Sequence, residues 1–175
     1  MTLRLTTKLK NRLQQPNLIM APGVVDAMNA RLVAEAGFEA IYMTGAGTTA
    51  ARLGMPDVGL LSVIEMADNA GRIADASGLP LISDADTGYG SPVNVFRTVS
   101  LFEKAGVAGI HIEDQNWPKR CGHLAGKTLI PANEMAAKIN AACDARKDSD
   151  FTIIARTDAL ALHGLNAALD RAKLY

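Results

Sequence analysis

The sequence lacks the features that mark several common classes of protein. It has only two cysteines, Cys121 and Cys143, too few for a disulfide framework or a paired zinc motif, so we expect a reducing compartment and a cytoplasmic protein. Lys and Arg together number 18, as do Asp and Glu, and this zero net charge argues against nucleic-acid binding, which normally needs a basic face. No apolar run approaches the length that spans a membrane. The 175 residues, 49% of them hydrophobic, instead predict one globular domain over residues 1–175.

Acidic residues are also missing from the first 25 residues, since the first acidic residue of the chain is Asp26. Basic residues occur there instead, as they do in an organellar transit peptide. However, Leu5, Leu9 and Leu13 recur every four residues, which is typical of one face of a helix. We therefore expect an N-terminal helix, and a transit leader is the alternative.

Short apolar runs alternate with helical patterns along the whole chain. Five runs predict strands at 18–20, 40–43, 81–83, 109–112 and 151–155. Helical patterns occupy about 26–36, 62–77, 92–105, 132–146 and from about 166 onward. This strict alternation predicts an α/β fold with a parallel sheet. Because polar residues follow every strand, we favour a (β/α)8 barrel of the TIM type over a doubly wound sheet.

Carboxylates follow the third and fourth of these strands. Asp84 and Asp86 alternate along the chain, so both can face one point, and Glu113 can reach the same point directly or through water. Carboxylates held so close repel one another unless a cation lies between them, and Mg²⁺, or Mn²⁺ in its place, prefers such oxygen ligands. The plainer interpretation of Asp-x-Asp alone is helix capping or surface chemistry. We expect His111, within the fourth strand, to be an interior side chain rather than a ligand.

A glycine-rich stretch that begins at Gly45 follows the second strand and resembles a dinucleotide-binding fingerprint. Such a turn must open a continuous helix, and Gly54 and Pro56 would interrupt this one. We therefore expect a loop of small residues that offers backbone N–H groups to a carboxylate, with Asp57 on the same loop.

The stretch Lys119-Arg120-Cys121-Gly122-His123 places a thiol between cations and near a histidine. Such surroundings are expected to lower the pKa of the cysteine and to suit a group that exchanges protons near neutral pH. The glycine suggests a mobile loop that could act as a lid. The alternative is an inert cysteine in a basic surface loop. We expect Cys143 to be packed within a helix.

Together these motifs resemble the isocitrate lyase and phosphoenolpyruvate mutase superfamily over nearly the whole chain. The matching motifs are Pro22-Gly23 with Asp26-Ala27, Thr44-Gly45-Ala46-Gly47, Asp84-Ala85-Asp86-Thr87-Gly88-Tyr89-Gly90, His111-Ile112-Glu113-Asp114-Gln115, Lys119-Arg120-Cys121-Gly122-His123 and Ala155-Arg156-Thr157-Asp158-Ala159. The resemblance implies a (β/α)8 barrel that binds Mg²⁺ and 2-oxo or 2-hydroxy acids, and a homotetramer for full-length relatives. The cysteine motif is similar to that of the lyase branch, which cleaves methylisocitrate or 2-alkylmalates to a 2-oxo acid and a carboxylate.

The resemblance also implies a role for each candidate residue. Asp86 would bind Mg²⁺ directly, and Asp84 and Glu113 would act largely through bound water. Cys121 would be the general acid. The other implied roles are a carboxylate clamp for Arg156, orientation of the site for Asp57, a further catalytic part for His123 and for Tyr42, and substrate contacts for Thr44, Gly45, Ala46 and Gly122.

Two alternatives stay open. One is decarboxylation of oxaloacetate or a phosphonomutase-type reaction, which needs the metal and Arg156 but not a cysteine acid. The other is an inactive binding remnant, because a complete barrel needs about 250 residues. Since only five βα units are visible, we expect a TIM-type barrel that is cut short after about five of them.

Overall fold

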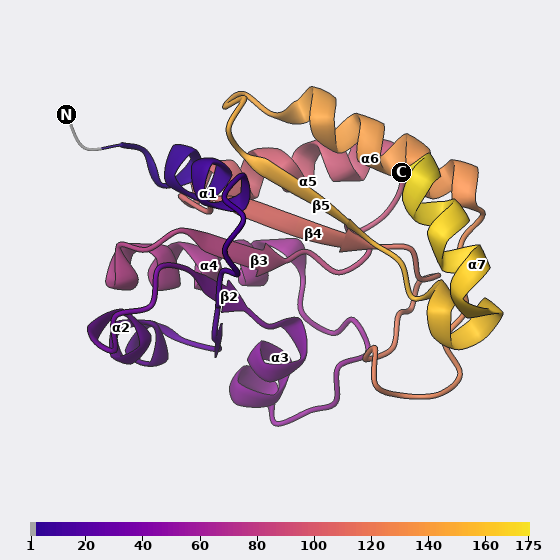
Figure 1. Cartoon of the computed structure of the whole chain (residues 1–175). Coiled ribbons are helices and arrows are strands. Elements are labelled where there is room, and N and C mark those ends of the chain that lie inside the picture. Colours follow the sequence, from indigo (N-terminus) through magenta and orange to yellow (C-terminus); the bar gives the residue numbers. More distant parts are fainter. Residues whose placement is uncertain (1–2) are drawn as a thin grey trace.

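The computed structural model describes residues 3–175 and contains a five-stranded parallel sheet (Figure 1). Its strands are β1 (Gly23–Val24), β2 (Ile41–Met43), β3 (Leu81–Asp84), β4 (Gly109–Glu113) and β5 (Thr152–Arg156). The strands lie side by side in chain order, from β1 to β5. A doubly wound sheet would reverse its order at a switch point, whereas neighbours that follow one another in a single direction form the wall of a barrel. The predicted α/β fold with five βα units is therefore confirmed.

The first strand lies later in the chain than expected. The apolar run at 18–20 is not a strand, and Leu18 and Met20 are 86% and 64% exposed. The Arg12 guanidinium donates to the carbonyls of Asn17 and Leu18 at 2.8 Å, so these backbone groups are bound to the N-terminal helix rather than to β2. Pairing with β2 begins only at the Pro22 carbonyl. An apolar run of three residues thus did not suffice to locate an edge strand.

The helices pack mainly on one side of the sheet, and all except the short helix after β2 follow the predicted pattern. They are α1 (Leu5–Leu13), α2 (Ala27–Glu35), α3 (Gly45–Leu53), α4 (Val63–Ser77), α5 (Pro92–Lys104), α6 (Ala132–Ala145) and α7 (Ala159–Leu174). The expected N-terminal helix is present as α1. The last helix begins at Ala159, earlier than the expected start near Asn166, and it is broken at Gly164, whose φ of 81° is not helical. No helix within residues 3–175 is both long and apolar enough to cross a membrane.

The glycine-rich stretch after β2 is helical, so the expected loop is wrong. The Thr44 side chain accepts a hydrogen bond from the Gly47 N–H and caps the start of α3. The helix ends after nine residues at Gly54, whose φ of 62° lies in the left-handed region. The prediction that Gly54 interrupts a helix is therefore correct. The small residues before Gly54 nevertheless form a short helix, which the Thr44 N-cap and close packing stabilise.

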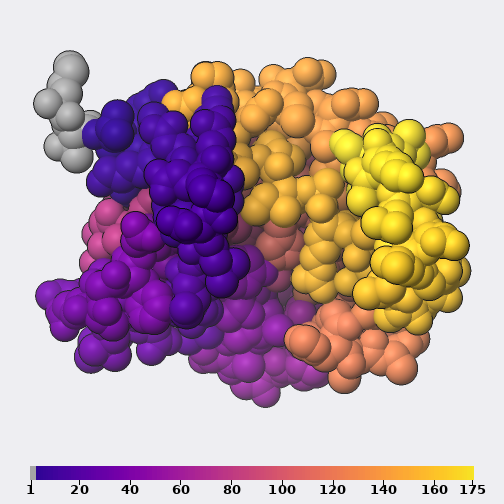
Figure 2. Space-filling model, viewed as in Figure 1, coloured from indigo at the N-terminus to yellow at the C-terminus, as the bar shows by residue number. Residues whose placement is uncertain are grey.

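The core lies between the sheet and the outer helices. Every residue of β4 is buried, whereas β5 is only half-buried. In Figure 2 the residues of β5 are visible at the surface between the N-terminal part and the C-terminal helix. At the opposite end of the strands from the site described below, α1 is tied to the segment before β5, because Lys10 pairs with Asp150 at 2.8 Å and Thr6 donates to Asp148 at 2.7 Å.

Candidate active site

The carboxyl ends of the strands enclose a cavity of about 310 Å³. Its walls come from β2, β3, β4 and β5 and from the two connections that follow β2 and β4. The lining residues are Tyr42, Thr44, Ala46, Asp57, Asp84, Glu113, Lys119, Cys121, Gly122, His123 and Arg156. The structure thus brings together every candidate residue except Gly45 and Asp86, which lie directly behind this wall. Lys119 is an addition to the set.

Asp84 is held by backbone groups at the end of β3. Its Oδ2 accepts a hydrogen bond from the Gly45 N–H at 3.1 Å, and its Oδ1 accepts one from the Asp86 N–H at 2.9 Å. A Cβ atom on Gly45 would lie 2.5 Å from Asp84 Oδ2, so only glycine permits this approach. Gly45 therefore acts in this structure as the anchor of a carboxylate of the chain itself.

Asp86 is paired with a lysine that arrives from the connection after β4. Its backbone is left-handed, with φ 47°, and its Oδ1 lies 2.6 Å from the Nζ of Lys119. The same Nζ lies 2.6 Å from Asp57 Oδ1, so one buried ammonium joins two carboxylates. Burial, then the charge of Asp84, raises the pKa of Asp86 to about 6, although Lys119 opposes the shift. Burial lowers the pKa of Lys119, but the two carboxylates outweigh it and raise that pKa above its ordinary value.

Glu113 ends β4 and faces Arg156 at the end of β5. The Arg156 Nη1 lies 3.5 Å from Glu113 Oε2, and its Nη2 lies 3.2 Å from Asp158 Oδ1. Burial raises the pKa of Glu113 to about 8, because the nearby cations of Arg156 and Lys119 compensate only in part. Arg156 keeps about a third of its side chain exposed, so its guanidinium can still reach a ligand in the cavity.

Tyr42 and His111 form a stacked pair beside Asp84. Their ring centroids are 5.5 Å apart, the Tyr42 hydroxyl is hydrogen-bonded to His111 Nε2, and this nitrogen lies 3.5 Å from Asp84 Oδ1. Burial lowers the pKa of His111, and burial together with the charge of Asp84 raises that of Tyr42. Both rings are therefore neutral near pH 7. His111 is an interior side chain, as expected, but it contacts two site residues, Tyr42 and Asp84.

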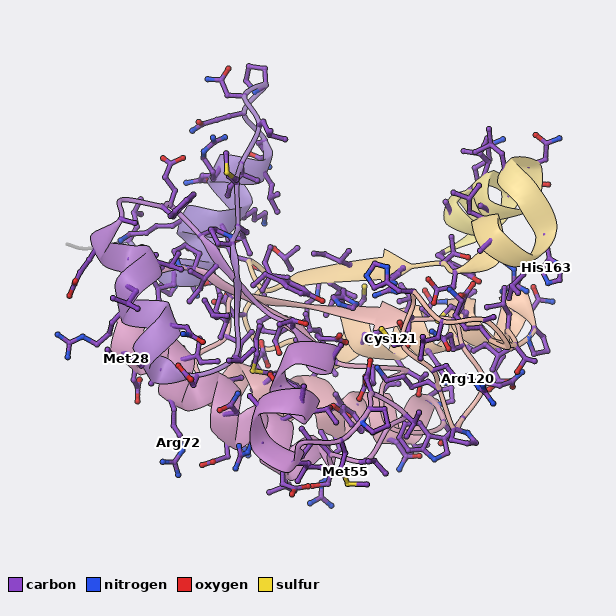
Figure 3. All side chains as sticks on the ribbon, turned by 90° about the horizontal axis from the view of Figure 1, so that it is seen from below. Met28, Met55, Arg72, Arg120, Cys121 and His163 are labelled. Carbon is purple, nitrogen blue, oxygen red and sulfur yellow. The ribbon has the colours of Figure 1, made fainter. Side chains whose placement is uncertain are left out.

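Residues 116–128, which we call the cysteine loop, close the cavity from the side. The Cys121 N–H donates to the Asp57 carbonyl at 3.0 Å, and the Gly122 carbonyl accepts a hydrogen bond from Lys127. Figure 3 shows Cys121 beneath the ends of the strands and Arg120 farther out on the same loop. The cations beside the cysteine in sequence thus have other surroundings, since Lys119 pairs with carboxylates and Arg120 is exposed.

The strand-end carboxylates Asp84, Asp86 and Glu113, which we call the acid centre, suit a divalent cation by their charge. With Asp57 they place four buried carboxylates beside two cationic side chains. Burial is the main cause of the raised pKa values of Asp86 and Glu113, and the charge of Asp84 adds to it. Within residues 3–175, no three His, Cys, Asp or Glu side chains lie close enough to enclose an ion by themselves. A cation here would therefore be held by few protein ligands and by water, which is the usual preference of Mg²⁺.

Three polar residues of this region were not among the predicted site residues. Lys119 joins Asp57 to Asp86, Gln115 contacts Glu113, and Asp158 orients Arg156. The signal that could have found Lys119 is the excess of acidic residues at the strand ends, which calls for a buried cation. Gln115 and Asp158 both lie within the matching motifs, but the contact between them joins segments that are 43 residues apart, and the local sequence does not reveal it.

Comparison with known proteins places these motifs in a family. Residues 9–175 match the family described as phosphoenolpyruvate phosphomutase. The chain is 49% identical over 168 residues to the 2,3-dimethylmalate lyase of Eubacterium barkeri, which covers 96% of this chain and 58% of that protein. It is 47% identical over 164 residues to the 2-methylisocitrate lyase of Escherichia coli, and this match covers 93% of this chain and 55% of that protein. The chain thus spans little more than half the length of these curated relatives.

Solved structures agree with the sequence relatives. A crystal structure of 2,3-dimethylmalate lyase matches with a TM-score of 0.94 at 44% identity, over 99% of this chain and 59% of that chain. An oxaloacetate acetylhydrolase bound to 3,3-difluorooxalacetate matches with a TM-score of 0.89 at 46% identity, over 97% and 59%. A phosphonopyruvate hydrolase in complex with oxalate and Mg²⁺ matches with a TM-score of 0.88 at 33% identity, over 99% and 59%. The chain therefore belongs to the phosphoenolpyruvate mutase and isocitrate lyase superfamily, in the branch of the dimethylmalate and methylisocitrate lyases.

Proposed function

We propose that this protein is a Mg²⁺-dependent carbon–carbon lyase that cleaves a 2-hydroxy di- or tricarboxylate, such as a 2-alkylmalate or methylisocitrate, to a 2-oxo acid and a carboxylate. The observation that carries the proposal is that Cys121, Arg156 and Glu113 line one cavity of about 310 Å³. A proton donor, a cation for a carboxylate and oxygen ligands for a metal are the elements that such a cleavage needs. The lyases among the relatives support the same reaction class.

The acid centre is where we place the metal. When bound, Mg²⁺ supplies Lewis acidity toward the hydroxyl and the adjacent carboxylate of the substrate. We assign Asp86 as its direct ligand, and Asp84 and Glu113 as the carboxylates that orient its water. Asp86 pairs with Lys119 behind the cavity wall in this structure, so the assignment requires its carboxylate to turn from Lys119 toward the cavity. The hydrogen bonds of Asp84 to two backbone N–H groups keep this part of the site in place.

Arg156 and Cys121 handle the charge and the proton of the cleavage. Breaking the carbon–carbon bond turns the hydroxyl carbon into a carbonyl and leaves the electron pair beside the second carboxylate, as an enediolate. The Arg156 guanidinium, oriented by Asp158 at 3.2 Å, donates hydrogen bonds to that developing charge. The Cys121 thiol then gives its proton to the carbon, and the proton that leaves the hydroxyl balances the one that Cys121 later regains. We place His123, exposed on the same loop, where it can exchange that proton with solvent.

The remaining candidates surround the 2-oxo acid. We propose that Tyr42, Thr44 and Ala46 contact it from the β2 side and that Gly122 contacts it from the cysteine loop, since all four line the cavity. Gly45 contributes by fixing Asp84, and Asp57 by holding Lys119. We further propose a cytoplasmic location and, for the full-length enzyme, a homotetramer, as the superfamily resemblance implies.

Product analysis with three substrates tests the proposed function. With Mg²⁺ present, 2,3-dimethylmalate should give pyruvate and propionate, or methylisocitrate should give pyruvate and succinate. Oxaloacetate chemistry is the second candidate, because an oxaloacetate acetylhydrolase is 46% identical in structure-based comparison. Pyruvate and CO₂, or oxalate and acetate, formed from oxaloacetate alone would favour it. Binding of Mg²⁺ and pyruvate without turnover of any substrate would instead indicate a binding protein.

A further inference from the structure

We infer that Gln115 is a positioning residue that couples the cysteine loop to the carboxylate and the arginine of the active site. The inference deepens the proposed function. It rests on that function in one respect, the role of Cys121 as proton donor. Gln115 lies two residues after the end of β4 and is 1% exposed. A glutamine side chain so deeply buried needs partners for all of its polar atoms, and those partners define its role.

Gln115 holds the main chain of the cysteine loop at two points. Its Oε1 accepts a hydrogen bond from the Arg120 N–H at 3.0 Å, and its Nε2 donates to the Arg120 carbonyl at 2.9 Å. The side-chain amide therefore pairs with a backbone residue much as two strands pair with each other. Arg120 directly precedes Cys121, so this pair fixes the backbone next to the thiol.

The same amide nitrogen also contacts both charged walls of the cavity. Nε2 lies 3.1 Å from Glu113 Oε1 and 2.6 Å from Asp158 Oδ2, in addition to the Arg120 carbonyl. An amide group has two protons, and here it faces three acceptors. The hydrogen bond from Nε2 to the Arg120 carbonyl thus competes with those to Glu113 and Asp158. When a ligand binds Glu113, an N–H of Gln115 becomes available to hydrogen-bond the loop.

The Asp158 end of this connection is fixed more firmly than the loop. The Asp158 N–H donates to Asp114 Oδ1 at 3.0 Å, and the fully buried Asp114 carboxylate also accepts from Thr157 at 2.7 Å and from Arg171 at 3.0 Å. Because Asp114 has several partners from α7 and the β5 end, movement at Gln115 is transmitted to the loop rather than to Arg156.

Asn116 provides a matched control within the same loop. Its Nδ2 donates to the Leu129 carbonyl at 3.0 Å and to Thr128 Oγ1 at 3.2 Å, so it joins the two ends of the loop without contacting Arg120 or the cavity. Loss of Asn116 should loosen the base of the loop, whereas loss of Gln115 should loosen the part that carries Cys121, which the Cys121 N–H bond to Asp57 and the Lys119 ion pairs would then hold.

The test is the rate at which iodoacetamide alkylates Cys121 in the chain without substrate or metal, with Cys143 as the internal reference. In Gln115→Glu and Gln115→Met, Cys121 should react at least about fivefold faster, as expected for the loss of an ordinary hydrogen bond that holds the loop. Asn116→Ala should change the rate by less than about twofold by the same measure. Where turnover is measured, the Gln115 variants should lower kcat and leave KM nearly unchanged.

Unchanged Cys121 alkylation in folded Gln115 variants, or an equal increase in Asn116→Ala, would overturn the inference. Should both Gln115 variants fail to fold, amide exchange in the unaltered chain decides, because the Arg120 N–H should be protected at least about tenfold by its bond to Gln115. An unprotected amide would contradict it. The two proposals can fail separately. If no substrate is cleaved but Cys121 is alkylated faster in the Gln115 variants, the proposed reaction is rejected, and the inference that Gln115 holds the cysteine loop stands.

Discussion

The acid centre and the cysteine loop differ in how the chain holds them. Asp84, Asp86 and Glu113 lie at or just after strand ends and are 7%, 4% and 2% exposed, and backbone N–H groups anchor Asp84. The cysteine loop has no helix, and apart from main-chain bonds such as that from the Cys121 N–H to the Asp57 carbonyl, side-chain contacts from Gln115, Asn116 and Lys119 hold it in place. The difference indicates that the proposed metal ligands are preorganised by the sheet, whereas the proposed proton donor lies on a loop outside it.

Removing a carboxylate from the acid centre should have the largest effect. Asp86→Ala should weaken Mg²⁺ or Mn²⁺ binding by more than the roughly 10–100-fold that loss of an outer partner costs. Asp84→Ala and Glu113→Ala should be milder, because we assign them to bound water. Isothermal titration calorimetry measures the affinities. Asp68→Ala, an exposed carboxylate that pairs with Arg72, is the control. Equal metal affinity in Asp86→Ala and the control would refute the assignment.

The cysteine loop should control rate without controlling metal binding. Cys121→Ser should lower kcat by about a hundredfold, the usual scale for a general acid, and leave the Mg²⁺ affinity unchanged. Cys143→Ser should have little effect on either quantity, because Cys143 lies on α6 away from the cavity lining. Steady-state kinetics in a lyase-active form of the enzyme checks both variants. Full activity in Cys121→Ser would exclude the thiol as proton donor and favour oxaloacetate chemistry.

The sequence predicted the acid centre because its geometry follows from local rules. Adjacent parallel strands end at the same edge of a sheet, and β3 pairs with β4 so that Asp84 lies opposite His111. Apolar runs located β2 to β5 well, since β2 to β4 are largely buried and the half-buried β5 is still a continuous apolar run. The edge strand β1 was misplaced, because exposed Leu18 and Met20 are as apolar as a true strand.

The parts that sequence reasoning missed depend on contacts between distant segments. Lys119 was expected to act on Cys121, its neighbour in sequence, but it pairs with Asp57 and Asp86, which lie far from it in the chain. The α3 helix was missed because Gly45 and Gly47 favour loops, and the Thr44 cap and the bond to Asp84 override that preference. Propensity and spacing do not contain this information.

A smaller effect concerns the stability of the metal-free chain. The pKa of Glu113 is raised to about 8, so the folded protein keeps a proton that the unfolded chain loses near its ordinary value of 4.5. Stability should therefore fall as the pH rises from about 5 to about 8. Glu113→Gln removes the carboxyl group that titrates, so the Tm of this variant should rise relative to that of the unaltered chain across this pH range. The expected difference is about 2–4 °C for each kcal/mol of folding stability that the unaltered chain loses. Circular dichroism melts in EDTA measure it, and parallel pH profiles of the two Tm values would contradict this account.

The most direct test of the central claim asks whether the acid centre and Cys121 form one site. Mg²⁺ and pyruvate together should slow the alkylation of Cys121 by iodoacetamide, because the bound 2-oxo acid fills the cavity that Cys121 lines. Neither additive alone should protect as well, and Cys143 should react at the same rate throughout. Asp86→Ala should abolish the protection. A Cys121 rate that is the same with and without Mg²⁺ and pyruvate would show that the two regions do not share a substrate.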